Sequence, residues 1–180
     1  MVIGYYDGVV MDNRNIILVG FMGTGKSSTG RIVAERLGRR FVDMDALIEE
    51  QAGKSIPKIF AENGEPHFRS LERNLVRDLS GRTGLVIAPG GGIVLNPENI
   101  ADFSRTGLVI CLHATPQMIL ARVGADANRP LLQGGDQLQT ITDLLAKRQP
   151  LYDAIPHRID TDGFTPADVA GKVIELFRKS

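Results

Sequence analysis

The sequence predicts an α/β protein in which helices cover both faces of a five-stranded parallel sheet. From Asn15 onward, short apolar runs alternate with longer amphipathic stretches, and this alternation implies right-handed crossovers between parallel strands. The first apolar run, residues 16–19 (IILV), is continuous, as expected of a strand that is buried on both faces. In such sheets ligands bind beyond the carboxyl ends of the strands, so the motifs at those ends matter most.

Strand and helix signals follow one another along the chain. The helix after the first strand has Gly38 as its stop, and Ser55 is expected to cap a later helix. The predicted strands are residues 16–19, 41–42, 85–87, 108–112 and 158–160. The predicted helices are residues 26–37, 46–52, 55–62, 66–79, 116–123, 137–153 and 166–179. Residues 66–79 carry apolar side chains at three-to-four spacing, which is typical of one buried helix face.

The length of 180 residues suits a single domain, which we expect to span residues 14–180 after a loose leader, residues 1–13. The 21 basic side chains balance the 21 acidic ones, so no general attraction to nucleic acid or to acidic membranes is expected. Cys111 is the single cysteine and lies in an apolar run, which predicts a buried thiol and no intramolecular disulfide. No apolar run reaches the ~20 residues of a membrane helix. We therefore expect a cytoplasmic protein, and the absence of a heptad pattern favours a monomer.

Residues 20–27 (GFMGTGKS) match the phosphate-binding pattern G-x-x-x-x-G-K-[ST] at every fixed position. Glycines let the backbone N–H groups wrap a triphosphate, and the helix that begins near Lys26 points its positive end at the phosphates. Lys26 supplies a mobile charge and the Ser27 hydroxyl is a Mg²⁺ ligand. The motif follows a predicted buried strand and opens a predicted helix, which makes it more specific than the pattern alone.

Two aspartates, Asp43 and Asp45, follow the second predicted strand. A carboxylate at a strand end opposite the phosphate loop can accept a proton from a hydroxyl nucleophile or from Mg²⁺-bound water. Strand alternation would put both carboxylates on the same side and Met44 on the other. The alternative is that Asp45 only caps the helix that begins at Ala46.

Gly90, Gly91 and Gly92 follow the third predicted strand. Three consecutive glycines suit a backbone that a small ligand approaches closely, although a plain turn remains possible.

Three arginines are further candidates, although each alone would ordinarily be a solvated surface residue. Arg129 is the best of them, because it lies in an aperiodic segment with small residues, about residues 124–136. Such a segment is typical of a lid that closes over phosphates, where an arginine neutralises the transferring phosphoryl group. The other two are Arg69 and Arg148.

Together these motifs resemble shikimate kinase, from about Asn15 to the C-terminus. The motifs occur in the family's order: the phosphate loop, Asp43-x-Asp45, Glu65-x-x-Phe68-Arg69, Gly90-Gly91-Gly92, Arg129-Pro130-Leu131-Leu132 and Arg148-x-Pro150-Leu151-Tyr152. One departure is Pro89, because the family more often has a small hydroxyl residue before the glycines.

The resemblance implies a three-layer αβα fold of the P-loop kinase type. It implies a helical substrate-binding region at about residues 43–80 and a lid at about residues 124–136. The implied reaction transfers the γ-phosphate of ATP to the 3-hydroxyl of shikimate, with Mg²⁺, on the route to chorismate and the aromatic amino acids. The implied partners are therefore small molecules, with no nucleic acid.

The resemblance also implies the role of each site residue. Lys26, Asp45 and Arg129 would be catalytic, with Asp45 as the base. Ser27 and Asp43 would hold Mg²⁺. The substrate would contact Asp45, Arg69, Gly90, Gly91, Gly92 and Arg148, the two arginines holding its carboxylate. The nucleotide would contact Gly23, Thr24, Gly25, Lys26, Ser27, Ser28, Arg122, Arg129 and Pro166, with Arg122 and Pro166 beside adenine.

Two other functions remain open at this point. A sister P-loop kinase that acts on another polyol, such as a gluconate kinase, could share the phosphate loop and a carboxylate clamp. The triple glycine and the Arg-x-Pro-Leu-Tyr run favour shikimate. A nucleotide-binding regulator without catalysis would be expected to lack Lys26, Asp45 or Arg129, and all three are present.

Overall fold

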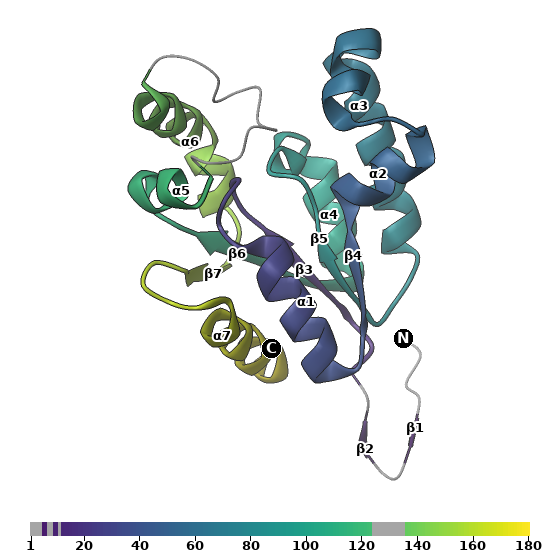
Figure 1. Cartoon of the computed structure of the whole chain (residues 1–180). Helices are drawn as coiled ribbons and strands as arrows, with labels where there is room; N and C mark the ends of the chain where they lie inside the picture. The colour runs from purple at the N-terminus through teal and green to yellow at the C-terminus, as the bar shows by residue number, and fades with distance from the viewer. Residues whose placement is uncertain (1–4, 7–8, 11, 124–135) are drawn as a thin grey trace.

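The computed structural model describes residues 5–6, 9–10, 12–123 and 136–180. Its main sheet has five parallel strands in the order β4-β5-β3-β6-β7, which confirms the predicted fold class (Figure 1). These strands are β3 (Asn15–Val19), β4 (Arg40–Asp43), β5 (Leu85–Ala88), β6 (Gly107–His113) and β7 (His157–Asp160). The strand before the phosphate loop, β3, is therefore at the centre of the sheet.

Helices cover both faces of this sheet (Figure 1). One face packs against α1 (Lys26–Leu37) and α7 (Pro166–Lys179). Side chains of the other helices join the core on the opposite face. Those helices are α2 (Met44–Ala52), α3 (Ile56–Ser80), α4 (Pro97–Thr106), α5 (Pro116–Val123) and α6 (Gln137–Asp153).

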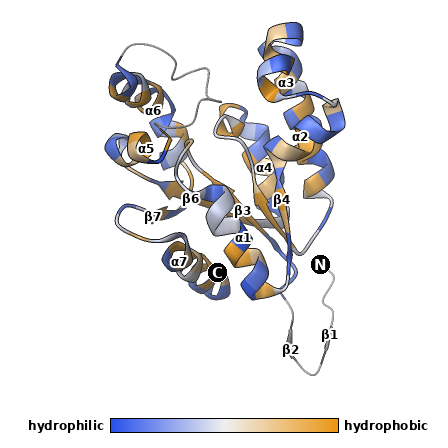
Figure 2. Cartoon of the chain, viewed as in Figure 1, coloured by the Kyte–Doolittle hydropathy of each residue, from blue (hydrophilic) through white to orange (hydrophobic). Residues whose placement is uncertain are grey.

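The central strand supplies side chains to both cores in alternation. Ile16 and Leu18 belong to the cluster with α1 and α7, whereas Ile17 and Val19 belong to the cluster on the other face. All four are fully buried, as the continuous apolar run predicted. Figure 2 shows the strands as an apolar layer between helices whose outer faces are polar.

The helical segment after β4 differs from the prediction in detail. The two helices predicted at residues 55–62 and 66–79 are halves of one kinked helix, α3, broken at Gly64, whose φ of 80° and ψ of 167° are not helical. Ser55 stands at the N-cap of α3, but its side chain makes no capping hydrogen bond. The N–H of Ile56 donates instead to Oε1 of Glu49, 2.8 Å away.

Two further elements were not predicted. After the triple glycine comes a short 3₁₀ helix, η1 (Ile93–Leu95), followed directly by α4. Asn96 caps α4 by accepting a hydrogen bond from the N–H of Glu98 at 3.0 Å. This segment returns the chain from the site to β6.

The described part of the leader contains two short strands, β1 (Tyr5–Tyr6) and β2 (Val9–Val10), which pair antiparallel. The chain just before β3 is held by Arg39, which donates to the carbonyl of Arg14 at 2.6 Å and to that of Asp12. The guanidinium groups of Arg14 and Arg39 both lie over the ring of Phe177 on α7. Among the helices of the described residues, none has the length and apolar character needed to cross a membrane.

Candidate active site

The phosphate loop links β3 to α1 and depends on its glycines. Gly20, Gly23 and Gly25 all have positive φ, at 143°, 74° and 89°. The space around Gly20 also excludes a side chain, because a Cβ there would lie 2.3 Å from the carbonyl oxygen of Leu112 on β6. The loop therefore keeps its shape only with glycine at these positions.

Three side chains of the loop and the first turn of α1 are hydrogen-bonded to carbonyls of the loop. The Lys26 ammonium donates to the carbonyl oxygens of Gly20 and Phe21, each at 2.9 Å. Thr24 donates to the Phe21 carbonyl at 2.8 Å, and Ser28 donates to that of Gly25 at 3.1 Å. These bonds stiffen the loop and hold the lysine charge over it.

Ser27 and Asp43 are in direct contact, although they lie on different elements. The Ser27 hydroxyl donates to Oδ2 of Asp43 at 2.8 Å. Hydroxyl and carboxylate oxygens are ligands that Mg²⁺ prefers, so the pair fits that cation. Within the described residues, no group of three or more His, Cys, Asp or Glu side chains could hold a metal ion.

Asp43, rather than Asp45, caps α2. The N–H of Ala46 donates to Oδ1 of Asp43 at 3.4 Å, and Asp43 has the extended backbone of an N-cap residue. Because β4 ends at Asp43 and α2 begins at Met44, strand alternation does not extend to Asp45. Asp45 lies in the first turn of α2 and faces a different neighbour, Gly90.

Each of the three glycines after β5 lies against a different part of the site. A Cβ on Gly90 would lie 2.7 Å from Oδ1 of Asp45, and one on Gly92 would lie 2.5 Å from Nη1 of Arg69. A Cβ on Gly91 would lie 3.3 Å from the backbone nitrogen of Met22 in the phosphate loop. All three are described residues and none has a positive φ, so close packing rather than turn geometry favours glycine here.

Helix α6 reaches the same glycine run from the other side. The Tyr152 hydroxyl donates to the carbonyl oxygen of Gly91 at 2.7 Å, and Nη1 of Arg148 donates to that oxygen at 3.5 Å. Burial raises the pKa of Tyr152 to about 12, against the opposing effect of the Arg148 charge. The Arg148 guanidinium also lies over the Phe21 ring, 5.8 Å from its centroid. Arg148 is thus held between the phosphate loop and Gly91.

A buried carboxylate that the sequence analysis did not single out, Glu72, holds Arg69. Nη1 of Arg69 donates to Oε2 of Glu72 at 2.9 Å, and Glu72 is 2% exposed. Burial raises the pKa of Glu72, and the charges of Arg69 and Arg148 oppose this while that of Asp45 adds to it. The sequence does contain a signal for Glu72: it is a charged residue on the apolar face of the predicted helix, four residues after Phe68.

Arg122 connects the phosphate loop to the segment after β7. Its guanidinium donates to the Gly23 carbonyl at 3.2 Å and to the side chain and carbonyl of Thr161 at 2.9 and 2.8 Å. Pro166 follows that segment as the first residue of α7, directly after Thr165, whose side chain caps the helix. Arg129 and residues 124–135 of the predicted lid lie outside the described residues.

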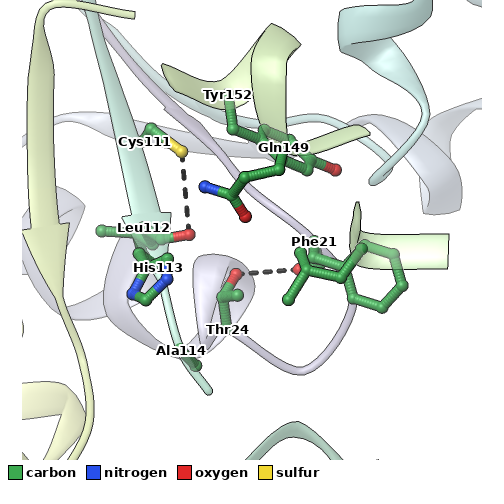
Figure 3. Close-up of a pocket in the computed structure, with 9 residues that line it drawn as sticks. Phe21, Thr24, Cys111, Leu112, His113, Ala114, Gln149 and Tyr152 are labelled. Atoms are coloured by element: carbon green, nitrogen blue, oxygen red, sulfur yellow. Dashed lines mark hydrogen bonds between the residues drawn. The ribbon is translucent and has the colours of Figure 1, made fainter. Parts of the chain in front are cut away.

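A small pocket lies behind the phosphate loop, between Thr24 and the side chains of Gln149 and Tyr152 (Figure 3). Its volume of about 10 Å³ is close to that of a single water-sized sphere, so it is too small for a nucleotide. Cys111 lines it and is 2% exposed, as predicted, and burial raises the pKa of its thiol to about 11. The pocket is therefore part of the packing between the loop and α6.

A model of the family described as "Shikimate kinase" matches residues 22–178. A shikimate kinase of Thermodesulfovibrio yellowstonii is 43% identical over 166 residues, which is 92% of this chain and 96% of that protein. One of Pelotomaculum thermopropionicum is 45% identical over the same length and the same shares. The structure of shikimate kinase from Acinetobacter baumannii in complex with shikimate superposes with a TM-score of 0.88 at 39% identity, covering 93% of this chain and 94% of the other.

Proposed function

Because the chain belongs to the shikimate kinase family, we propose that it phosphorylates shikimate with ATP, at the 3-hydroxyl. One observation supports assigning this function to particular residues. The glycine run is in contact with Asp45, the phosphate loop and Arg69, one at each of its three residues. The phosphate-binding loop and the groups that could bind a small acidic polyol therefore adjoin the same glycine run.

The acceptor half of the site matches the chemistry of shikimate. A substrate with one carboxylate and several hydroxyls needs guanidinium groups at one end and a carboxylate acceptor at the other. We propose that Arg69 and Arg148 bind the carboxylate and that Asp45 contacts the reacting hydroxyl. The support is their common contact with consecutive glycines, Asp45 with Gly90, Arg148 with Gly91 and Arg69 with Gly92.

In the reaction, Asp45 would orient the hydroxyl and accept its proton, while Lys26 would stabilise charge on the transferring phosphoryl group. The side chains proposed to hold Mg²⁺ are Ser27 and Asp43, and a bound Mg²⁺ would neutralise charge on the β- and γ-phosphates. Most of the rate gain would come from positioning and electrostatics rather than from covalent chemistry. Arg129 is proposed to close over the phosphates from the lid.

For the nucleotide, Gly23, Thr24, Gly25 and Ser28 are proposed to contact the phosphates. Arg122 and Pro166 are proposed to lie beside adenine. The support for Arg122 is its bond to Gly23, which keeps its guanidinium next to the loop.

We further propose that the protein acts as a monomer on small molecules, without nucleic acid, in the cytoplasm. The balanced charge of the chain supports the absence of a nucleic-acid partner. A single buried cysteine and no disulfide suit a reducing compartment.

An ADP-release assay with shikimate, gluconate and nucleoside monophosphates as acceptors tests the function. We expect turnover with shikimate and none with the others, and no turnover with shikimate would contradict the proposal. Arg69→Ala should then raise KM for shikimate far more than KM for ATP. Arg77→Ala, an exposed arginine of the same helix, is the matched control and should change neither.

A further inference from the structure

Two glutamates of α3 hold the guanidinium of Arg69, and they differ in their surroundings. Glu72 is buried, and its Oε2 accepts one hydrogen bond from Nη1 at 2.9 Å. Glu65 has a side chain that is 56% exposed, and its Oε1 accepts from both Nε and Nη2 of Arg69, at 3.1 and 3.0 Å. Three of the five guanidinium N–H groups are therefore engaged by carboxylates.

This arrangement places two carboxylates on one positive charge. Arg69 is the residue proposed to bind the substrate's carboxylate, which would be the third anionic group at the same guanidinium. Repulsion from the carboxylates already there would cancel much of the attraction that a third one gains. The full charge of Arg69 is available to a substrate only after one glutamate side chain breaks its contact with the guanidinium.

Glu65 is the glutamate that can leave. It directly follows Gly64, where the backbone breaks the helix with a φ of 80° and a ψ of 167°. It also borders a cavity of about 370 Å³, which lies between α3 and the segment around Leu95, Asn96 and Asn99. The carboxylate of Glu65 can thus swing away from Arg69 without any change in the packed core, whereas Glu72 cannot.

We propose that Glu65 occupies Arg69 in the free enzyme as a stand-in for the carboxylate of the substrate, and that the substrate displaces it. The inference rests on the proposed function, because it takes shikimate as the acidic substrate. Glu65 is then a positioning residue that the carboxylate of the substrate must displace, at a cost in affinity. A ligand without a carboxylate does not compete with Glu65 for Arg69.

The variant Glu65→Gln tests this proposal. It removes the charge but keeps the length of the side chain, so KM for shikimate should fall roughly two- to fivefold, the range expected for an exposed ion pair. KM for ATP and kcat should not change, because the contact exists only before shikimate binds. The matched control is Glu62→Gln, since Glu62 is on the same segment and pairs with Lys54 at 2.9 Å. The control should leave all three constants unchanged.

A second comparison separates competition from a general effect on the fold. Shikimate amide, in which a neutral amide replaces the carboxylate, should bind the wild type and Glu65→Gln with the same affinity in calorimetry. In crystals with shikimate bound, Oε1 of Glu65 should lie beyond hydrogen-bond distance of Nε of Arg69.

Each other outcome overturns the inference. A raised KM for shikimate in Glu65→Gln would show that Glu65 orients Arg69 in the complex, and an unchanged KM would show that the two carboxylates do not compete. A Glu65–Arg69 bond that persists with shikimate bound would also contradict it. Failure of the function is distinguishable, since then the wild type itself would not turn over shikimate.

Discussion

The guanidinium group of Arg69 lies against the backbone of Gly92 so closely that no side chain fits between them. A Cβ on Gly92 would lie 2.5 Å from Nη1 and 2.6 Å from Nη2 of Arg69. Real Cβ atoms essentially never approach other heavy atoms within 3.0 Å. The position of the proposed carboxylate clamp thus depends on the missing side chain at residue 92 as well as on the glutamates that hold it.

Gly92→Ala should therefore act on the binding of shikimate. The methyl group would push the flexible end of Arg69 away, and the fold would remain because Gly92 has an ordinary φ of −88°. Loss of a hydrogen bond to a charged group costs about 1.5–3 kcal/mol, so KM for shikimate should rise roughly 10- to 150-fold. KM for ATP should stay constant. Gly171→Ala, on α7, is the control, and equal changes in both KM values for Gly92→Ala would count against the interpretation.

Asp43→Asn separates the helix cap from the charge at residue 43. Asparagine caps helices as well as aspartate does, so the melting temperature should stay close to that of the wild type. The loss of charge beside Ser27 should raise the Mg²⁺ concentration at half-maximal rate by roughly 10-fold or more. The measurement is the rate of ADP release against Mg²⁺ concentration. An unchanged Mg²⁺ dependence would exclude Asp43 from the metal site.

Glu72 should make stability depend on pH with a definite sign. Burial raises its pKa in the folded protein, so the folded state keeps a proton that the unfolded chain releases near pH 4.3. The wild type therefore loses stability as pH rises from there through the raised folded pKa. Glu72→Gln cannot titrate, so its melting temperature relative to the wild type should rise with pH over this window and then level off. A difference that is constant or falls with pH would contradict the prediction.

Cys111 should be nearly inert in the folded protein. The thiolate is the reactive species, and burial raises the pKa of this thiol to about 11. A disulfide reagent such as dithionitrobenzoate should label one thiol at once in denaturant but only slowly in buffer, and ATP should slow the reaction further by stabilising the folded state. Cys111→Ser gives the blank. Rapid stoichiometric labelling of the native protein would show that β6 is open behind the phosphate loop.

The strands and most helices could be predicted from local sequence patterns, whereas α4 was not predicted. Two polar residues of α4 are buried, Asn99 at 1% and Asp102 at 8% exposure. Both face Arg73 of α3, which lies 2.6 Å from Asp102 and 3.5 Å from Asn99. Local patterns do not predict polar side chains in a core, so only the tertiary partner, Arg73, explains why Asn99 and Asp102 are inside.

The candidate site, too, has features that the sequence can predict and features that only the tertiary structure shows. The phosphate loop could be predicted because its residues are consecutive and each has a chemical reason. The role of Glu72 and the contacts of Gly90 with Asp45 and of Gly92 with Arg69 join residues that are distant in the sequence or hidden on a buried face. The cap at Asp43 was assigned to Asp45 as an alternative, because the sequence does not show that α2 begins at Met44.

The strand order has a consequence for how the protein is made. β3 pairs only with β5 and β6 in the main sheet, and β6 begins at Gly107, far behind Val19 at the end of β3. At roughly 5–20 residues per second, a ribosome needs on the order of 4–18 seconds to add the intervening chain. During that interval the phosphate loop is already synthesised, while the strand that carries it still lacks at least one of its two neighbours. The phosphate loop is therefore synthesised early, whereas the sheet around it is completed late. A chaperone that binds the emerging chain would shield its central strand.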